Sequence, residues 1–301
     1  MQLWFLIFLG VALVSSAHKI RHKNYKDLRY KVTRGVDKKY QTLDWYYTSG
    51  KSKSVSRRRG VVIYIHGGGW RAGDKKNNIK DKVKYFRDRH GYNFVSINYR
   101  LMTKDCKKQV GWPKKTTVPC KFPDNAYDVA AAISYVLDNA LKYGSNPATV
   151  SLIGHGAGAH LAALVSTDKK YLAAYNRYLE NINFVALIDT NAFRLSYRVR
   201  DVDTMVNAFG HKKQVWWDAS PINFVHSKRR KCEIPPQLLL FSGKPKRKEN
   251  MNAYVEKLKK SGCIVKTYNA KHYSRSQLIK AIGGKNMVSY QIFDVLTSYN
   301  L

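Results

Sequence analysis

Residues 154–158 read GHGAG, and this glycine-rich run joins two segments with opposite structural preferences. Residues 149–153 are rich in β-branched and aliphatic side chains, which favours a strand, whereas residues 157–165 are rich in alanine and leucine, which favours a helix. Because glycine adopts backbone angles that are closed to other residues, the run predicts a sharp turn from strand to helix. A side chain at position 156 would be strained by about 1–3 kcal/mol, a cost that Gly156 avoids.

The rest of the chain alternates short β-rich segments with longer helical ones. We expect strands at residues 42–47, 61–66, 94–98, 150–154, 184–188, 238–242 and 264–268. We expect helices at residues 79–89, 126–143, 157–167, 202–209, 250–261, 274–282 and 288–299. Repeated strand–helix–strand units form parallel sheets, so the pattern predicts an α/β fold with a mostly parallel twisted sheet and helices on both faces.

Three further motifs accompany the glycine turn: residues 64–70 (YIHGGGW), 98–100 (NYR) and 124–128 (DNAYD). Together with GHGAG, they make the chain resemble an α/β-hydrolase of the esterase and lipase type, and in particular the arylformamidase-like esterases. The resemblance runs from about residue 40 to the C-terminus. It implies the α/β-hydrolase fold and the positions of a catalytic site, but it does not imply activity.

The resemblance places the family's nucleophilic serine at position 156, where this chain has glycine. It also implies an oxyanion hole formed by backbone amides of Gly68, Gly69 and Ala157, because consecutive glycines can turn their amides toward a developing negative charge. The expected pocket residues around this hole are His66, Gly67, Trp70 and His155. A glycine turn that serves packing alone is the alternative.

The same resemblance places the general base at His272, after the last expected strand. The acid would follow the preceding strand, where Glu249 is the only carboxylate; Asp189, after an earlier strand, is a poorer candidate. The segment around Glu249 also contains the cations Lys244, Lys246, Arg247 and Lys248. Cations disfavour the imidazolium that a triad acid stabilises, so we expect two of the three catalytic roles to be damaged.

The N-terminal residues 1–17 form an apolar run that ends in Ser-Ser-Ala, which predicts a signal peptide and a secreted, extracellular protein. An uncleaved membrane anchor is the alternative, although the run is short for a span. Residues 18–40 are basic and weakly patterned, so we interpret them as an arm that leads into one domain at residues 41–301. Residues 102–122 are expected to form a long loop over the pocket.

Four cysteines in an exported chain predict two disulfides, and sequence alone allows three pairings. We favour Cys106 with Cys120, which closes one loop, and Cys232 with Cys263, because these two precede strands that are expected to be neighbours. Free buried thiols are the alternative.

Lys and Arg outnumber Asp and Glu by 54 to 20, which gives a net charge of +34 with no charged residue in the first 17. Such an imbalance favours an anionic partner, and clusters of cations bind polyanions through counterion release. The basic runs contain Arg57, Arg58, Arg59, Lys228, Arg229, Arg230, Lys231, Lys244, Lys246, Arg247 and Lys248. The alternative for any single run is a solvated surface.

The expected partner is an extracellular acidic polymer: a sulfated glycan, an acidic matrix protein or a mineral-associated polyanion. A nucleic-acid partner is disfavoured by the export signal and by the absence of a recognition motif.

The sequence therefore predicts a secreted α/β-hydrolase homologue that has lost hydrolysis and binds polyanions, with no cofactor or metal. Two alternatives stay open. The chain could be an active carboxylic-ester or amide hydrolase that uses a displaced nucleophile or an activated water, with His155 and His272 as bases. Alternatively, glycine at position 156 could be an engineered or sequencing variant of a normal enzyme.

Overall fold

The structure, a computed structural model, describes residues 21–49, 60–102, 120–195, 202–226, 231–242 and 245–299. Its described strands form one eight-stranded sheet in the order β1-β2-β4-β3-β5-β6-β7-β8. The pairs β1–β2 and β2–β4 are antiparallel, and all other pairs are parallel, which confirms the predicted mostly parallel sheet. The strands are β1 (Arg21–Arg29), β2 (Thr42–Ser49), β3 (Val61–Ile65), β4 (Asn93–Ile97), β5 (Val150–His155), β6 (Phe184–Ile188), β7 (Gln237–Phe241) and β8 (Val265–Asn269).

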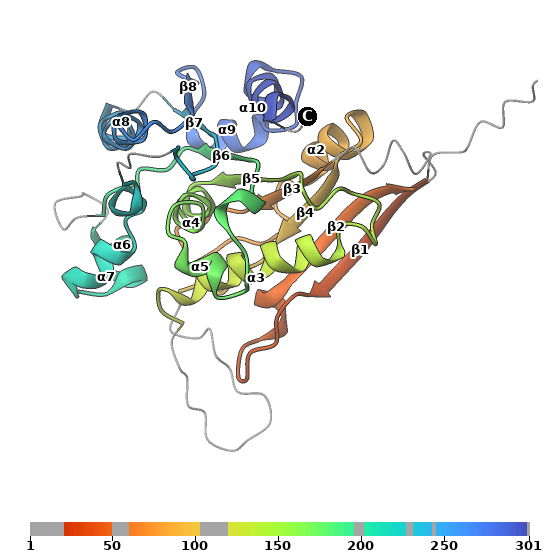
Figure 1. The fold of residues 1–301 in the computed structure, drawn as a ribbon, viewed down its shortest axis with the longest axis horizontal. Coiled ribbons are helices and arrows are strands. Elements are labelled where there is room, and N and C mark those ends of the chain that lie inside the picture. Colours follow the sequence, from red (N-terminus) through yellow and green to blue (C-terminus); the bar gives the residue numbers. More distant parts are fainter. Residues whose placement is uncertain are drawn as a thin grey trace, which may run out of the picture.

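Helices cover both faces of this sheet (Figure 1). The α-helices are α2 (Lys80–Val83), α3 (Asp124–Asn139), α4 (Ala157–Val165), α5 (Lys170–Ala173), α6 (Val202–Phe209), α7 (Lys213–Asp218), α8 (Pro245–Lys260), α9 (Arg275–Ala281) and α10 (Met287–Tyr299). A π-helix η2 (Lys84–Arg89) continues α2, and the 3-10 helices of the described residues are η1 (Lys38–Gln41), η3 (Leu179–Asn181) and η4 (Pro221–Phe224). The core on one face includes side chains of α3, α4 and α8, whereas the core on the other face includes side chains of η2, α9 and α10.

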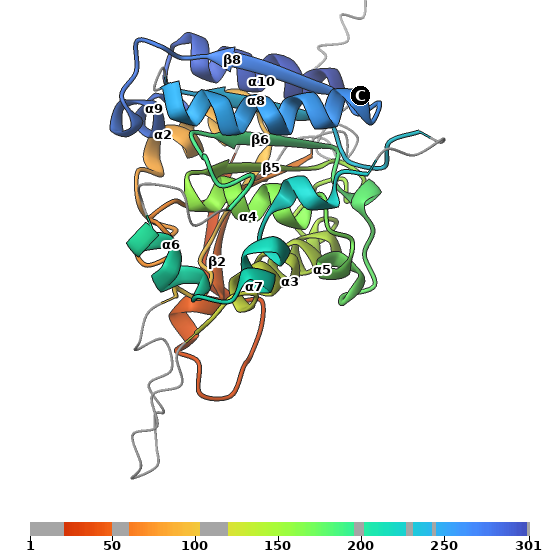
Figure 2. The ribbon, with the colours of Figure 1, turned by 90° about the vertical axis from the view of Figure 1, so that its left-hand side faces the viewer.

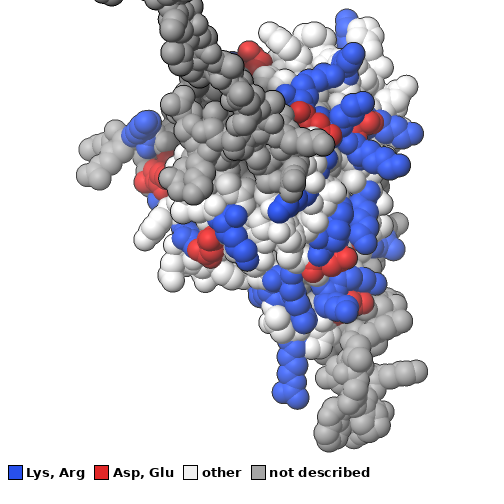
Figure 3. Space-filling view, turned by 90° about the vertical axis from the view of Figure 1, so that its right-hand side faces the viewer, with Lys and Arg blue, Asp and Glu red and all other residues white. Residues whose placement is uncertain are grey.

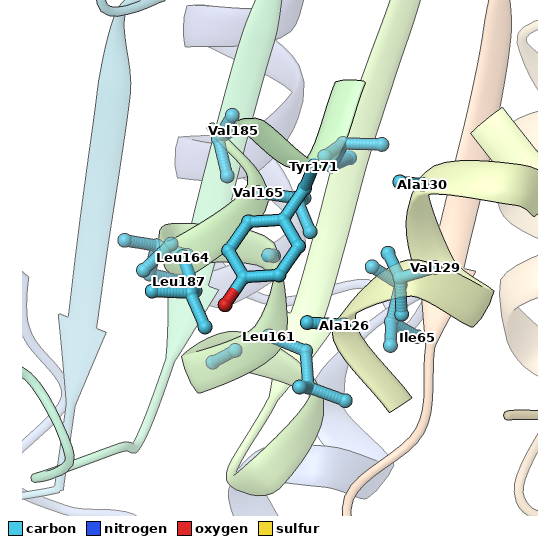
Figure 4. Close-up of a cluster of buried hydrophobic side chains, with 14 of the residues drawn as sticks. Ile65, Ala126, Val129, Ala130, Leu161, Leu164, Val165, Tyr171, Val185 and Leu187 are labelled. Carbon is cyan, nitrogen blue, oxygen red and sulfur yellow. The ribbon is translucent and has the colours of Figure 1, made fainter. Parts of the chain in front are cut away.

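Side chains along each central strand alternate between these two cores. Val61, Ile63 and Ile65 of β3 belong to the first, and Val62 and Tyr64 belong to the second, as successive strand side chains point to opposite faces. Figure 4 shows part of the first core, where Tyr171 of α5 points among aliphatic side chains of α4, β6 and α3. The nearly continuous apolar runs of these strands are typical of a parallel sheet that is buried on both faces.

The predicted elements agree well with the observed ones where the hydrophobic pattern is strong. Strand β6 and helix α6 have the predicted bounds. Helix α8 begins at Pro245 rather than residue 250, because the basic first turns contain no apolar period that would mark them. The helix expected at residues 79–89 is divided into α2 and the π-helix η2.

The interpretation of residues 18–40 as an arm was wrong for residues 21–29, which form the edge strand β1 and pair with β2. Most of β1 is exposed, so its sequence lacks the apolar alternation of a half-buried strand. Polar contacts attach it instead: the buried Lys75 Nζ lies 2.5 Å from Asp44 Oδ1 and 2.6 Å from Asp27 Oδ1. The ring of Tyr25 also stacks on Tyr47, with centroids 5.7 Å apart.

The disulfide between Cys232 and Cys263 is present, with Cα atoms 5.1 Å apart, and it confirms one predicted pairing. These cysteines precede β7 and β8, which pair in parallel. Cys120 is also disulfide-bonded, whereas Cys106, its predicted partner, lies outside the described residues.

Lys82 on α2 is a buried cation, and we predict that it makes stability depend on pH. Its Nζ donates to the carbonyls of Asn78 (2.7 Å) and Ile279 (2.9 Å), and burial lowers the pKa of Lys82 to about 8. Below pH 8 both the folded and the unfolded protein carry the proton, and the folded state bears the full cost of burying the charge. As the pH rises from about 8 to 10.5, the folded state releases the proton first, and this cost of about 3 kcal/mol disappears.

We therefore compare the free energy of unfolding of Lys82→Met with that of the unaltered protein at each pH. This difference should favour the variant by about 2 kcal/mol more at pH 7 than at pH 10. Urea denaturation at the two pH values measures the difference. Lys80→Met is the matched control, because Lys80 is exposed on the same helix. Equal pH dependence in both variants would contradict the prediction.

Candidate functional site

The glycine turn lies at the C-terminal end of β5, and Gly156 has φ 56° and ψ −115° directly before α4. Its amide donates to the carbonyl of Ile188 (2.8 Å), and its carbonyl accepts from the amide of His160 (3.1 Å). A Cβ on Gly158 would lie 2.2 Å from the carbonyl oxygen of Ile65, so glycine is needed there for α4 to approach β3. The turn thus has the sharp strand-to-helix geometry that the sequence predicts.

The side chain of Arg275 lies over position 156. A Cβ built on Gly156 would be 2.5 Å from Arg275 Nη2, and the three nearest heavy atoms all belong to this arginine. Arg275 is the first residue of α9, whose N-cap Ser274 accepts a hydrogen bond from the amide of Gln277. This cap fixes the start of the helix and therefore the point from which the arginine reaches the turn.

Arg275 also faces the buried carboxylate of Asp189, with Nε 3.8 Å from Oδ2. Asp189 follows β6 and has a positive φ of 51°, and its other oxygen, Oδ1, accepts from the amide (3.1 Å) and the hydroxyl (2.7 Å) of Ser242. The guanidinium therefore lies between a carboxylate and position 156, where a triad imidazole would lie between acid and nucleophile. Unlike imidazole, a guanidinium stays protonated and cannot accept a proton.

The loop after β3 has the backbone expected of an oxyanion hole. Gly68, Gly69 and Trp70 all have positive φ, at 130°, 59° and 60°, and a Cβ on Gly68 would lie 1.9 Å from the carbonyl oxygen of Ala72. Within the described part of the chain, the amides of Gly68, Gly69 and Ala157 donate to no backbone carbonyl. These amides, at a glycine loop and at the first residue of a helix, are suited to bind negative charge.

The predicted pocket residues form the buried support beneath this loop. Trp70 Nε1 donates to His160 Nδ1 (3.1 Å), and His160 Nε2 contacts the carbonyl oxygen of Ala219 at 2.7 Å. Burial lowers the pKa of His160 to about 4, so this imidazole is neutral at physiological pH. His66 stacks on Tyr99 with centroids 4.5 Å apart, and its burial lowers its pKa. Gly67 touches His155: a Cβ there would lie 2.7 Å from His155 Nδ1.

The predicted base lies after β8, and the predicted acid lies on α8, after β7. His272 is exposed in the turn between β8 and α9, and Glu249 is exposed on α8. Asp189, the poorer acid candidate by sequence, faces Arg275 near position 156, because β6 is adjacent to β5 in the sheet. No motif singled out Arg275, since an arginine at a helix start carries no catalytic signal of its own.

Many predicted polyanion-binding residues and the signal segment lie outside the described residues. They are residues 1–17, Arg57, Arg58, Arg59, Lys228, Arg229, Arg230 and Lys244, together with the side chains of Lys246 and Arg247. Lys231 and Lys248 are exposed. Among the described residues, no helix is long and apolar enough to cross a bilayer, and no group of three His, Cys, Asp or Glu side chains could hold a metal ion.

A cavity of about 790 Å³ adjoins the glycine loop on the side of α6 and α7. Its described lining residues are Arg71, Met102, Cys120, Lys121, Phe122, Val206, Asn207, Ala208, Phe209, Gly210, His211, Lys212 and Val215. Phe209 connects the cavity to the buried residues beneath the glycine loop, because its ring packs on Trp70 with centroids 5.0 Å apart. Neither Gly156 nor the four predicted pocket residues line this cavity.

Comparison with known proteins finds esterases and other hydrolases. The chain is 27% identical to the esterase LipQ of Mycobacterium tuberculosis over 209 residues, which cover 62% of the chain and 42% of LipQ. It is 27% identical to the kynurenine formamidase-like hydrolase fscH of Fusarium equiseti over 204 residues, 62% of the chain and 65% of that protein. The chain thus spans less than two thirds of the length of either relative.

Among solved structures, esterase B of Lactobacillus rhamnosis superposes with a TM-score of 0.71 at 18% identity, covering 93% of the chain and 86% of that protein. A truncated carbohydrate esterase from gut microbiota superposes with a TM-score of 0.70 at 16% identity, covering 92% and 96%. These likenesses show the α/β-hydrolase fold. The family described as BD-FAE matches residues 43–245, about two thirds of the chain, and the chain belongs to this esterase-type α/β-hydrolase family.

Proposed function

We propose that this BD-FAE family member has lost serine-esterase chemistry and acts as a secreted binding protein for extracellular acidic polymers. The observation that carries the proposal is the position of Arg275, whose guanidinium lies 2.5 Å from where the Cβ of a residue 156 side chain would be. Gly156 carries a hydrogen atom instead of a nucleophilic hydroxyl, and Arg275 supplies a permanent cation instead of a proton acceptor.

The chemistry of each role supports this proposal. Without a nucleophile, a serine hydrolase loses about six orders of magnitude in rate and keeps about 10³–10⁴-fold over water from the oxyanion hole and binding. Asp189 would orient an imidazole in a working triad, but its facing partner here is Arg275. The amides of Gly68, Gly69 and Ala157 can still receive an anion, and Arg275 adds a positive charge beside them.

The charge of the whole chain supports the polymer-binding part. The net charge of +34 is spread along the sequence rather than confined to one run. On the face shown in Figure 3, which β1 borders, Lys and Arg side chains are far more abundant than Asp and Glu. A surface of this kind gains affinity for a polyanion by releasing its counterions. The apolar segment at residues 1–17 supports an extracellular polymer as the partner.

Binding to heparin tests the polymer-binding part. We expect retention well above physiological ionic strength, with the logarithm of the association constant falling against the logarithm of salt concentration with a slope of about −4 or steeper. Affinity measurements at four or more NaCl concentrations give this slope, and uncharged dextran on the same support is the control. A slope close to zero, or elution near physiological salt, would contradict polyanion binding.

A working ester hydrolase is the second candidate, favoured by the intact glycine loop and by the hydrolase names of the relatives. Hydrolysis of p-nitrophenyl acetate and labelling by a fluorophosphonate probe separate the two candidates. We expect the unaltered protein to show neither. Stoichiometric labelling of a side chain near the turn would reject the loss of catalysis and leave polymer binding to be judged by its own measurement.

A further inference from the structure

The cavity beside α6 and α7 has apolar walls. Met102 and Phe209 are buried, and Phe122, Val206 and Val215 are half-buried around the same space. Phe122 and Phe209 pack edge to face with centroids 5.5 Å apart, which gives the wall a continuous aromatic section. At about 790 Å³, the cavity is within the range of natural small-molecule sites, about 300–1,000 Å³.

The rim of this cavity is cationic. Arg71, Lys121 and Lys212 are exposed, and all three line the cavity, as does His211. No Asp or Glu is among the described lining residues. The cations come from three separate segments: the end of the glycine loop, the residues before α3, and the turn between α6 and α7. Helices α6 and α7 lie near α4 in Figure 2. Apolar walls below a positively charged rim favour a ligand that has an apolar body and an anionic group.

We propose that this cavity binds an amphipathic organic anion, with an aliphatic or aromatic body between Met102, Phe122 and Phe209 and a carboxylate at the rim. The apolar body of the ligand moves from water into contact with the apolar walls, and the carboxylate stays half-solvated beside Lys212 and Arg71. A neutral ester lacks the charge that the rim recognises, and a cationic amphiphile is repelled by it. The site does not include Gly156 or Arg275, so it does not depend on whether the chain hydrolyses esters.

Titration calorimetry with sodium decanoate, below the concentration at which it forms micelles, tests this site. We expect saturable one-to-one binding, with 1-decanol binding more weakly and decyltrimethylammonium not competing. Lys212→Gln should weaken decanoate binding by about twofold to fivefold, as expected for one exposed ion pair, and should leave the affinity for decanol unchanged. The matched control is Lys213→Gln, which removes the same charge from the neighbouring exposed residue that does not line the cavity, and it should change little.

Filling the cavity tests the location independently of charge. Val206→Trp should weaken decanoate binding by about tenfold or more, because the larger side chain takes the space of the ligand. Val215→Trp, from α7, makes the same test if the first variant does not fold. Absence of saturable decanoate binding, equal affinity for decanol, equal effects of Lys212→Gln and Lys213→Gln, or full binding by both folded tryptophan variants would each overturn the proposal.

Discussion

Serine at position 156 is expected to leave the protein inert toward p-nitrophenyl acetate until Arg275 is removed as well. The new hydroxyl would face a guanidinium that cannot accept its proton. The clash of its Cβ with Arg275 Nη2 involves the far end of a flexible side chain, so Arg275 can move aside and the variant should fold. The positive φ of residue 156 adds a strain of about 1–3 kcal/mol, which thermal denaturation of Gly156→Ser would reveal.

The double variant Gly156→Ser/Arg275→Ala opens the space between the new hydroxyl at position 156 and the Asp189 carboxylate. Because Arg275 is about half exposed, imidazole from solution can enter this space and act as the missing base. We expect hydrolysis to rise with imidazole concentration and to exceed that of Gly156→Ser by about 10²-fold. Activity without imidazole would assign proton transfer to a base of the protein itself, for which His155 and His272 are the candidates.

The control for this experiment is Arg275→Ala with Gly156 retained, which has the same opening and no nucleophile. It measures the hydrolysis that imidazole catalyses when position 156 carries no nucleophile. If Gly156→Ser alone turned over substrate, or if the double variant were no faster than this control, Arg275 would not be the group that blocks the site.

Asp128→Asn is expected to cost about 3–5 kcal/mol in free energy of unfolding, because it leaves a buried arginine without its fully buried counter-ion. Arg100 Nε lies 2.6 Å and Nη2 2.8 Å from the two oxygens of Asp128, and the amide of Arg100 donates to the same carboxylate at 3.0 Å. Burial works against the charged guanidinium, but the hydrogen bonds and charge of Asp128 outweigh it, so the pKa of Arg100 is raised.

Urea denaturation of Asp128→Asn measures this cost. Asp124→Asn is the matched control, because Asp124 also contacts Arg100, at 3.2 Å, but its side chain is 36% exposed; it should cost less than about 1 kcal/mol. The double variant Arg100→Met/Asp128→Leu should recover most of the loss, since it removes both buried charges. Equal costs for the two single variants would show that burial does not set the strength of this pair.

This ion pair explains why two of the sequence motifs mark the fold. Residues 98–100 follow β4, and residues 124–128 begin α3, and Arg100 joins to Asp128 across the space between them. The motifs could be recognised one by one, but their contact depends on where α3 packs on the sheet. The same limit applies to Arg275, which contacts the turn only because α9 starts near the ends of β5 and β6.

Sequence by itself determined the features that depend on local backbone preference and covalent composition. The glycines of residues 154–158 required a sharp turn, Gly156 excluded a hydroxyl there, and the order of strands and helices indicated a parallel sheet. Only the tertiary structure decided that β1 attaches as an edge strand through Lys75 and that Arg275 and Asp189 flank the turn. These contacts join residues that are far apart in the chain. They form only after the sheet has brought the segments together, so no local sequence pattern could predict them.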